Sequence, residues 1–257
     1  MSVLTYLQNR ASNAVLSTTE QTSINTSIST LSSRLNSYFG TTVAQHFRFG
    51  SSTRGTILPR AMDEHSDIDY MIVFSESGYT PQTYIDRLRR FADAYYTSSD
   101  IKQSSPTIVL QLNHIKFDLV PALADTWTTA YKIPEGPSAW QNTNPNDFNA
   151  TLTTKNQSEY GLIKPTIRLA KFWNAKAGYV FDSYAFEKWI VEQYYYLGSN
   201  QKDYLFAAFD KLVANQAAQW RNERINRAKE IIAKVREYER DNMPYTAESE
   251  VKKLIPE

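Results

Sequence analysis

The sequence predicts an α+β fold, in which a mixed sheet with helices is followed by a C-terminal helical lobe. Two segments rich in strand-forming residues, 67–74 and 107–120, flank a helical segment, and this order is typical of a mixed sheet with helices. A stretch with several prolines, 121–150, follows and predicts a loop-rich connector. Beyond it, apolar residues recur at helical spacing almost to the end. We therefore expect two domains, 1–145 and 146–257.

Two amphipathic helices are expected in the N-terminal part. The first lies in a segment rich in Ser and Thr and ends at Gly40, because glycine commonly stops helices. Its apolar positions are Ile24, Ile28, Leu31, Leu35 and Tyr38. The second begins at Pro81, since proline is favoured in the first turn of a helix. Its apolar positions are Tyr84, Leu88, Phe91 and Tyr95.

The strand that begins at Asp67 carries the first candidate site residues. Asp67 and Asp69 are two residues apart in an extended segment, so both side chains point to the same face of the sheet. The opposite face is expected to be core and consists of Ile68, Tyr70, Ile72 and Phe74. Two neighbouring carboxylates repel each other unless a cation lies between them. Hard oxygen ligands of this kind suit Mg²⁺.

A third carboxylate lies in the next pair of strands. Segments Thr107–Leu112 and Ile115–Val120 are predicted to be strands joined by a tight turn. Asp118 interrupts the apolar pattern of the second strand, and a carboxylate there is unfavourable unless it is paired or binds metal. Three aspartates on adjacent strands are able to hold two metal ions. Asp67, Asp69 and Asp118 are therefore the candidate catalytic and metal-binding residues.

Gly50 and Ser51 are expected to form a turn that opens a helix ahead of the carboxylate strand. Such a turn offers backbone N–H groups and a hydroxyl, which favour an anion such as phosphate. Ser51 also suits a simple N-cap. Arg54 and Thr56 either line this phosphate cradle or complete the turn, and Arg54 also suits a solvent-facing position. A phosphate cradle beside a divalent-metal site indicates phosphoryl or nucleotidyl transfer.

The C-terminal part is predicted to be nearly all helix. The expected helices span residues 160–177, 184–197, 204–220 and 223–240. Pro165, inside the first of them, implies a kink or a helix start at that point.

Together these motifs resemble those of the DNA polymerase β-like nucleotidyltransferases, whose pattern is Gly-Ser, Asp-x-Asp and a distal Asp on a neighbouring strand. Within that superfamily the chain looks like the cGAS/DncV-like nucleotidyltransferases of bacterial anti-phage signalling. The similarity lies in Gly50-Ser51-x-x-Arg54-Gly55-Thr56, in the run 167–174 and in Ser183-Tyr184-x-x-Glu187.

The resemblance implies a substrate cleft between a nucleotidyltransferase core and the helical lobe. It implies two Mg²⁺ ions on the three aspartates, with Mn²⁺ as a substitute, and donor phosphates held by the Gly-Ser turn. It also implies that Lys171 reaches the donor triphosphate, that Ser183 binds phosphate and that Tyr184 stacks on the donor base. The residues alone leave simpler roles open, with Lys171 a lysine that buries its stem and Ser183 an N-cap.

The activity implied by the resemblance is the joining of NTPs, ATP among them, into a cyclic di- or trinucleotide with release of pyrophosphate. The product would activate a separate effector protein in the anti-phage defence called CBASS. Three alternatives stay open. One is a nucleotidyltransferase that modifies a protein, RNA or small molecule, as AMPylating antitoxins and antibiotic nucleotidylyltransferases do. The second is a linear oligonucleotide synthase. The third is an inert nucleotide-binding module, which has no use for three unfavourable carboxylates together.

The composition excludes several other kinds of site. Cys is absent, which excludes a thiolate nucleophile, a disulfide scaffold and a Cys-based zinc site. The three His residues match no zinc motif, so we do not expect the double-stranded DNA sensing that a zinc insertion gives the animal member of the family. A net charge of +1 gives no basic excess for nucleic acid. Because no apolar run approaches a membrane span, we expect a soluble, cytoplasmic enzyme without a membrane partner.

Overall fold

A computed structural model describes residues 2–104, 106–125, 128–196 and 198–257. The chain divides into two compact units. The sheet unit comprises Ser17–Arg60 and Glu64–Ala150. The helical unit comprises the described residues up to Leu16, together with Ala61–Asp63 and Thr151–Glu257.

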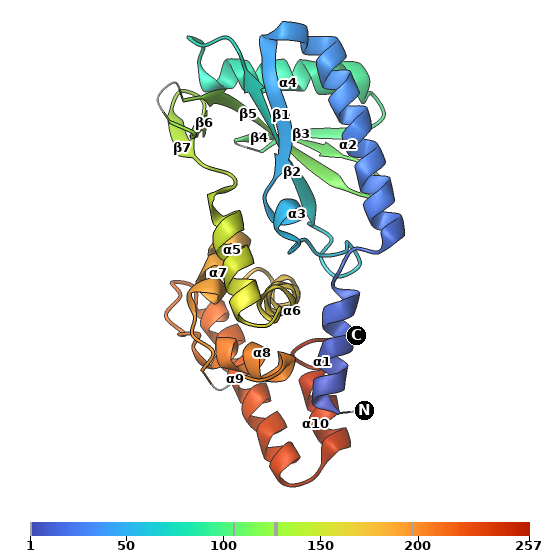
Figure 1. The fold of residues 1–257 in the computed structure, drawn as a ribbon, viewed down its shortest axis with the longest axis vertical. Helices are drawn as coiled ribbons and strands as arrows, with labels where there is room; N and C mark the ends of the chain where they lie inside the picture. The colour runs from blue at the N-terminus through green and yellow to red at the C-terminus, as the bar shows by residue number, and fades with distance from the viewer. Residues whose placement is uncertain (1, 105, 126–127, 197) are drawn as a thin grey trace. The chain divides into compact units, whose positions relative to one another are not determined.

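The sheet unit is built on a mixed sheet (Figure 1). The main path of the sheet has the strand order β1-β2-β5-β4-β3, and β6 and β7 continue from β5. Strands β2 and β5 pair in parallel, and the other pairs are antiparallel. The strands are β1 Val43–Phe49, β2 Asp67–Phe74, β3 Asp100–Ser104, β4 Thr107–Gln111, β5 Lys116–Ala124, β6 Tyr131–Pro134 and β7 Trp140–Thr143. The predicted mixed sheet with helices is thus confirmed.

Two helices, α2 (Thr18–Phe39) and α4 (Pro81–Tyr95), pack on one face of this sheet. The ring of Phe74, at the end of β2, lies 5.4 Å from that of Phe39 in α2 and 5.0 Å from that of Tyr84 in α4. Because side chains alternate along a strand, the predicted apolar face of β2 is the one under these helices. All four of its predicted core residues are buried, namely Ile68, Tyr70, Ile72 and Phe74.

The opposite face of β2 begins with charge and ends in an apolar cluster. Asp67 and Asp69 lie at its start, whereas Met71 and Val73 further along are buried together with Ala122 of β5. The cluster is completed by partly buried side chains, namely Phe47, Phe49, Tyr131 and Ile133. The two aspartates therefore lie at the polar end of an otherwise buried strand.

The helical unit confirms the predicted helical C-terminal lobe. Its helices are α1 Val3–Asn13, α6 Ile163–Lys176, α7 Ser183–Glu192, α8 Gln201–Asp210, α9 Gln219–Arg240 and α10 Pro244–Val251. Helix α1 contacts α6, α8 and α10, and the Tyr6 hydroxyl donates to the Ile255 carbonyl at 2.7 Å. The N-terminal helix, which the sequence prediction groups with the first domain, therefore packs on C-terminal helices. The division into domains at residue 145 stays a prediction.

The connector predicted at 121–150 contains more structure than expected. Strand β5 continues to Ala124, strands β6 and β7 follow, and helix α5 spans Asp147–Ser158. Pro121 is tolerated inside β5 because the pairing with β4 ends at Leu119 and the pairing with β6 begins at Leu123. Its missing N–H therefore breaks no bond on that side.

Two predicted helices are shorter than expected. The helix predicted at 204–220 ends at Asp210, and α9 begins only at Gln219. In the break, the Asn222 side chain accepts from the Gln216 N–H at 2.7 Å and donates to the Gln216 carbonyl at 2.8 Å, so it takes over the backbone bonds that a helix would use.

The helix predicted at 184–197 ends at Glu192, and Leu197 lies outside the described residues. For Pro165, the predicted helix start is confirmed. It is the third residue of α6, where a missing N–H has no acceptor within the helix.

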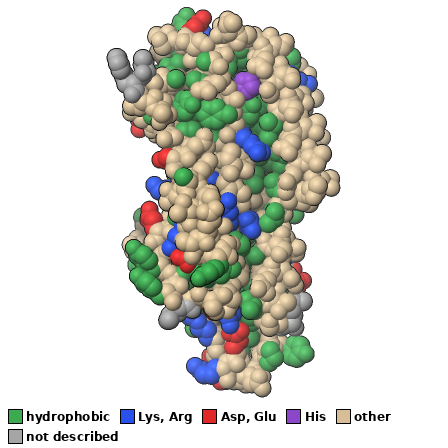
Figure 2. Space-filling view, viewed as in Figure 1, with side chains coloured by type: hydrophobic (Ala, Val, Ile, Leu, Met, Phe, Trp, Pro, Cys, Tyr) green, Lys and Arg blue, Asp and Glu red, His purple; other side chains and the backbone are tan. Residues whose placement is uncertain are grey.

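Within the described parts of the chain, no helix combines the length and apolar character that a membrane crossing needs. Lys and Arg side chains share the face drawn in Figure 2 with Asp and Glu side chains. This distribution agrees with the net charge of +1.

Candidate active site

The parallel pairing of β2 and β5 brings four charged residues onto one face of the sheet. Asp67 lies opposite Lys116, and Asp69 lies opposite Asp118. Paired residues of neighbouring strands point to the same side, and residues two apart on one strand do so as well. Three carboxylates and one ammonium group therefore share a small area, away from the face that α2 and α4 cover.

Lys116 is the cation of this group. Its Nζ lies 3.1 Å from Asp67 Oδ2 and 3.7 Å from Asp118 Oδ1. Burial pulls the pKa of Lys116 down, but the charges of Asp67 and Asp118 outweigh burial, so its pKa is raised. Lys116 is a site residue that the sequence reasoning missed. The available signal was its position two residues before Asp118, which puts it on the same strand face.

Asp118 is a carboxylate in an electrostatically unfavourable environment. Burial, followed by the charge of Asp67, raises its pKa to about 6, against the opposing effect of Lys116. Its Oδ1 is buried and has no hydrogen-bond partner among the described residues. Lys116, at 3.7 Å, offsets part of its charge without making that bond.

Asp69 lies against the Gly-Ser turn because β1 pairs with β2. Phe49 at the end of β1 is opposite Asp69, and Gly50 follows directly. A Cβ atom added to Gly50 would lie only 1.9 Å from Asp69 Oδ2. Gly50 also has φ 71° and ψ −152°, a backbone conformation that is essentially restricted to glycine. The turn and the carboxylate are thus in direct van der Waals proximity.

The turn leads into α3, Ser51–Arg54, whose N-cap is Gly50 and not Ser51. Ser51 is the first residue of this short helix, where backbone N–H groups have no acceptor within the helix. Arg54 is buried, which excludes the solvent-facing alternative, and its guanidinium carbon lies 5.8 Å from the centre of the Phe148 ring. Thr56 is fully buried and its N–H donates to the Ser51 carbonyl at 3.0 Å, so it holds the turn closed.

The remaining predicted residues belong to the helical unit. Lys171 of α6 is 8% exposed, which is less than expected of a lysine that extends its ammonium group into water. Ser183 is the first residue of α7, and the N-cap is Asp182, whose carboxylate accepts from the Ala185 N–H at 2.8 Å. The N-cap alternative for Ser183 is therefore wrong. The next residue, Tyr184, is 43% exposed, with Lys188 Nζ 5.9 Å from its ring centre.

The sheet-face residues suit a divalent cation by the type of their donor atoms and by their placement on adjacent strands. Asp118 Oδ1, buried and without a hydrogen bond among the described residues, is an oxygen that a cation would satisfy. As the side chains stand, however, no three carboxylate or imidazole groups in the described ranges converge on one point. Two of the aspartates approach Lys116 and the third lies against Gly50.

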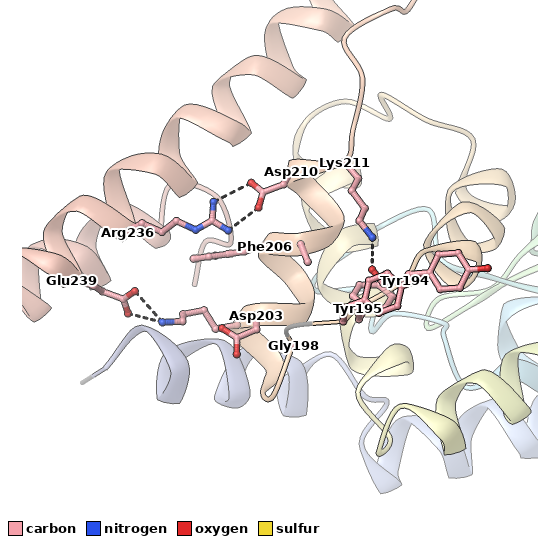
Figure 3. Close-up of a pocket in the computed structure, with 12 residues that line it drawn as sticks. Tyr194, Tyr195, Gly198, Asp203, Phe206, Asp210, Lys211, Arg236 and Glu239 are labelled. Atoms are coloured by element: carbon pink, nitrogen blue, oxygen red, sulfur yellow. Dashed lines mark hydrogen bonds and ion pairs between the residues drawn. The ribbon is translucent and has the colours of Figure 1, made fainter.

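A separate cavity of about 520 Å³ lies in the helical unit (Figure 3). Its lining includes three cationic and three acidic side chains, namely Lys202, Lys211, Arg236, Asp203, Asp210 and Glu239. Arg236 makes two hydrogen bonds to Asp210, Lys202 binds both oxygens of Glu239, and Lys211 donates to the Tyr194 carbonyl. The charges of these six side chains balance each other.

We predict that Asp118→Asn stabilises the metal-free protein at neutral pH. The raised pKa means that the folded state holds a proton on Asp118 more tightly than the unfolded state does. This contribution to stability is complete below pH ~4 and is lost as the pH rises through about 6. In EDTA at pH 7.5 the variant should therefore exceed the wild type by about 1–2 kcal/mol in the free energy of unfolding, with the difference vanishing near pH 4.

Urea denaturation at both pH values measures this difference. Asp100→Asn, at an exposed position on β3, is the control and should change little at either pH. A variant at position 118 that is no more stable than the wild type at pH 7.5 would contradict the electrostatic account.

We predict that Gly50→Ala destabilises the protein by about 2–4 kcal/mol, because a backbone conformation that only glycine adopts and a collision with Asp69 add together. Gly55→Ala is the matched control. Gly55 also has φ 71°, but no described atom lies within 4 Å of an added Cβ, so about 1 kcal/mol is expected. Chemical denaturation of both variants gives the comparison, and equal losses would show that Asp69 exerts no steric constraint on the turn.

Comparison with known families adds evidence independent of this geometry. Residues 1–156 match the model of the Second Messenger Oligonucleotide or Dinucleotide Synthetase domain. This match covers more than half of the chain and includes the Gly-Ser turn and all three aspartates.

Among curated proteins, a probable cyclic nucleotide synthase of Bacillus cereus is 26% identical over 196 residues, which cover 60% of this chain and 58% of the relative. The match thus spans less than two thirds of the relative's length.

Two solved structures share the fold at low sequence identity. CdnC of Escherichia coli MS115-1, solved with ATP, is 14% identical with a TM-score of 0.75, covering 100% of this chain and 98% of that chain. The CD-NTase CdnG of Bradyrhizobium diazoefficiens, solved with GTP, is 12% identical with a TM-score of 0.72, covering 97% of each chain. The domain match shows that the chain belongs to the Second Messenger Oligonucleotide or Dinucleotide Synthetase family, and the fold shared with CdnC and CdnG agrees with the resemblance to the cGAS/DncV-like nucleotidyltransferases.

Proposed function

We propose that this protein joins NTPs into a cyclic di- or trinucleotide and releases pyrophosphate. The observation that carries the proposal is that Asp67, Asp69 and Asp118 share one sheet face, with Gly50 beside Asp69. Family membership supports the same activity, because the domain model describes second-messenger synthetases and the curated relative is a probable cyclic nucleotide synthase.

In the proposed reaction a ribose hydroxyl of one nucleotide attacks the α-phosphate of another. A bond forms between the hydroxyl oxygen and the α-phosphorus, the bond to the bridging oxygen breaks, and pyrophosphate leaves. Asp118 would help to accept the hydroxyl proton, because it shares the sheet face with the two aspartates that would hold the metal with it. The backbone N–H of Ser51, at the start of α3, would hold donor phosphate oxygens.

The three aspartates would hold Mg²⁺, or Mn²⁺ in its place. When bound, such ions neutralise the triphosphate and lower the pKa of the attacking hydroxyl. The residues of the chain contribute the oxygen donors, which lie on adjacent strands.

We assign the remaining residues by the family resemblance. Lys171 and Ser183 would contact the donor triphosphate, and Tyr184, with its exposed ring, would stack on a base. Arg54 and Thr56, both buried, would support the Gly-Ser turn from behind. The product would act as a second messenger on a separate effector protein in cytoplasmic anti-phage defence of the CBASS type.

The proposal predicts turnover that depends on the aspartates. Purified protein would be incubated with all four NTPs and Mg²⁺ or Mn²⁺, treated with phosphatase and analysed by mass spectrometry. A phosphatase-resistant cyclic species is expected. Asp67→Asn/Asp69→Asn should lower its formation by at least about a hundredfold, because the donor set for the metal is lost. Asp93→Asn/Asp100→Asn removes two charges from exposed positions of the same unit and should leave turnover intact.

Other products would redirect the assignment. Pyrophosphate release with only phosphatase-sensitive oligomers would indicate a linear synthase. Incorporation of nucleotide into protein, RNA or an added small molecule would indicate a modifying nucleotidyltransferase. An enzymatic role would be contradicted if the protein binds nucleotides but the wild type and the aspartate variant show the same turnover, at the level of the background.

A further inference from the structure

The ammonium group of Lys116 lies between two of the three carboxylates, those of Asp67 and Asp118. Its Nζ contacts Asp67 at 3.1 Å and approaches Asp118 to 3.7 Å, from a side chain that is only 21% exposed. The arrangement is fixed by β-sheet register, because Lys116 is the residue paired with Asp67. It is therefore part of the sheet and does not result from a flexible surface lysine that happens to lie nearby.

An ammonium group and a divalent cation cannot both lie between Asp67 and Asp118. The Lys116 ammonium group and a divalent cation a few ångströms apart repel each other strongly, because a partly buried site screens charge less than bulk water does. In addition, the Asp67 oxygen that accepts from Lys116 would have to turn toward the metal. Binding of a metal at this face therefore requires Lys116 to move away.

We propose that Lys116 is a built-in counter-ion that holds the carboxylates of the metal-free enzyme and competes with the catalytic metal for them. This inference rests on the proposed metal-dependent function. Lys116 is then a positioning residue, and its presence lowers the affinity of the nucleotide-free protein for metal. It also accounts for the side-chain arrangement, in which Asp67 and Asp118 approach a lysine and no three carboxylates of the described residues converge.

A purely supporting role for Lys116 makes the opposite prediction. If its ion pairs held Asp67 and Asp118 in the geometry that binds metal, loss of the ammonium group would weaken metal binding. The sign of the change in metal affinity therefore separates the two roles.

The test is titration of nucleotide-free protein with Mn²⁺, followed by the electron paramagnetic resonance signal of the free ion. Lys116→Met keeps the length of the side chain and removes its charge, and it should bind Mn²⁺ about tenfold more tightly than the wild type. Lys102→Met is the matched control. Lys102 lies on β3, contacts Asp100 at 2.6 Å and is exposed, so its loss removes the same charge from the same sheet and should not change Mn²⁺ affinity.

Unchanged or weaker Mn²⁺ binding by Lys116→Met would overturn the proposal. Asp118→Asn distinguishes this result from a failure of the proposed function. If Asp118→Asn weakens Mn²⁺ binding while Lys116→Met does not strengthen it, the metal site stands and only the counter-ion role falls. If Asp118→Asn has no effect, Mn²⁺ binds elsewhere and both proposals fail.

If Lys116→Met does not fold, a second measurement, on protein of the unaltered sequence, tests the same proposal. Lysines would be labelled by reductive ¹³C-methylation, and the Lys116 resonance identified by its absence from Lys116→Arg. It should shift on addition of Mg²⁺, while the Lys102 resonance, assigned in the same way, stays in place. A Lys116 resonance that does not move in a sample shown to bind metal would overturn the proposal.

Discussion

The parallel pairing of β2 with β5 is the constraint on which the site depends. It aligns Asp67 with Lys116 and Asp69 with Asp118, and neighbouring strands are only about 4.8 Å apart. Three carboxylates and one ammonium group then share one face, and buried apolar side chains continue along it. Lys116 approaches Asp67 and Asp118, while Asp69 lies against Gly50. Burial, followed by the charge of Asp67, raises the pKa of Asp118.

The same sheet also sets the distance between the carboxylates and the phosphate turn. Phe49, the last residue of β1, pairs with Asp69, so the turn that follows β1 begins directly beside the Asp69 carboxylate. The close approach leaves no space for a side chain at position 50, and the backbone there has a conformation open essentially to glycine alone. Steric and conformational requirements thus coincide at one residue.

The aspartates could be predicted from local periodicity. The pairing between distant segments could not be predicted in this way. The two-residue spacing of Asp67 and Asp69 fixes their common face, and Asp118 stands out because it interrupts an apolar pattern. Lys116 lies on the same face of the alternating pattern as Asp118. A polar residue at the start of a strand is equally typical of a solvent-facing position, so the pattern alone does not mark Lys116 as a site residue. Its role depends on the register with β2, which single-sequence periodicity does not encode. The break between α8 and α9 was missed for a related reason, because it contains no glycine or proline and Gln216, near its end, bonds to the side chain of Asn222.

The charge balance of the site also bears on whether it serves catalysis or stability. For the sheet alone, an amide or apolar residue at position 118 would remove repulsion and burial of charge, so stability does not explain the aspartate. Nor does this face by itself favour a nucleotide, because its carboxylates repel a triphosphate. A polyanion binds beside such a face only if cations arrive with it or before it. Under the proposed function, the carboxylates of this face therefore make nucleotide binding depend on metal, and this dependence separates an enzyme of this family from a passive nucleotide-binding module.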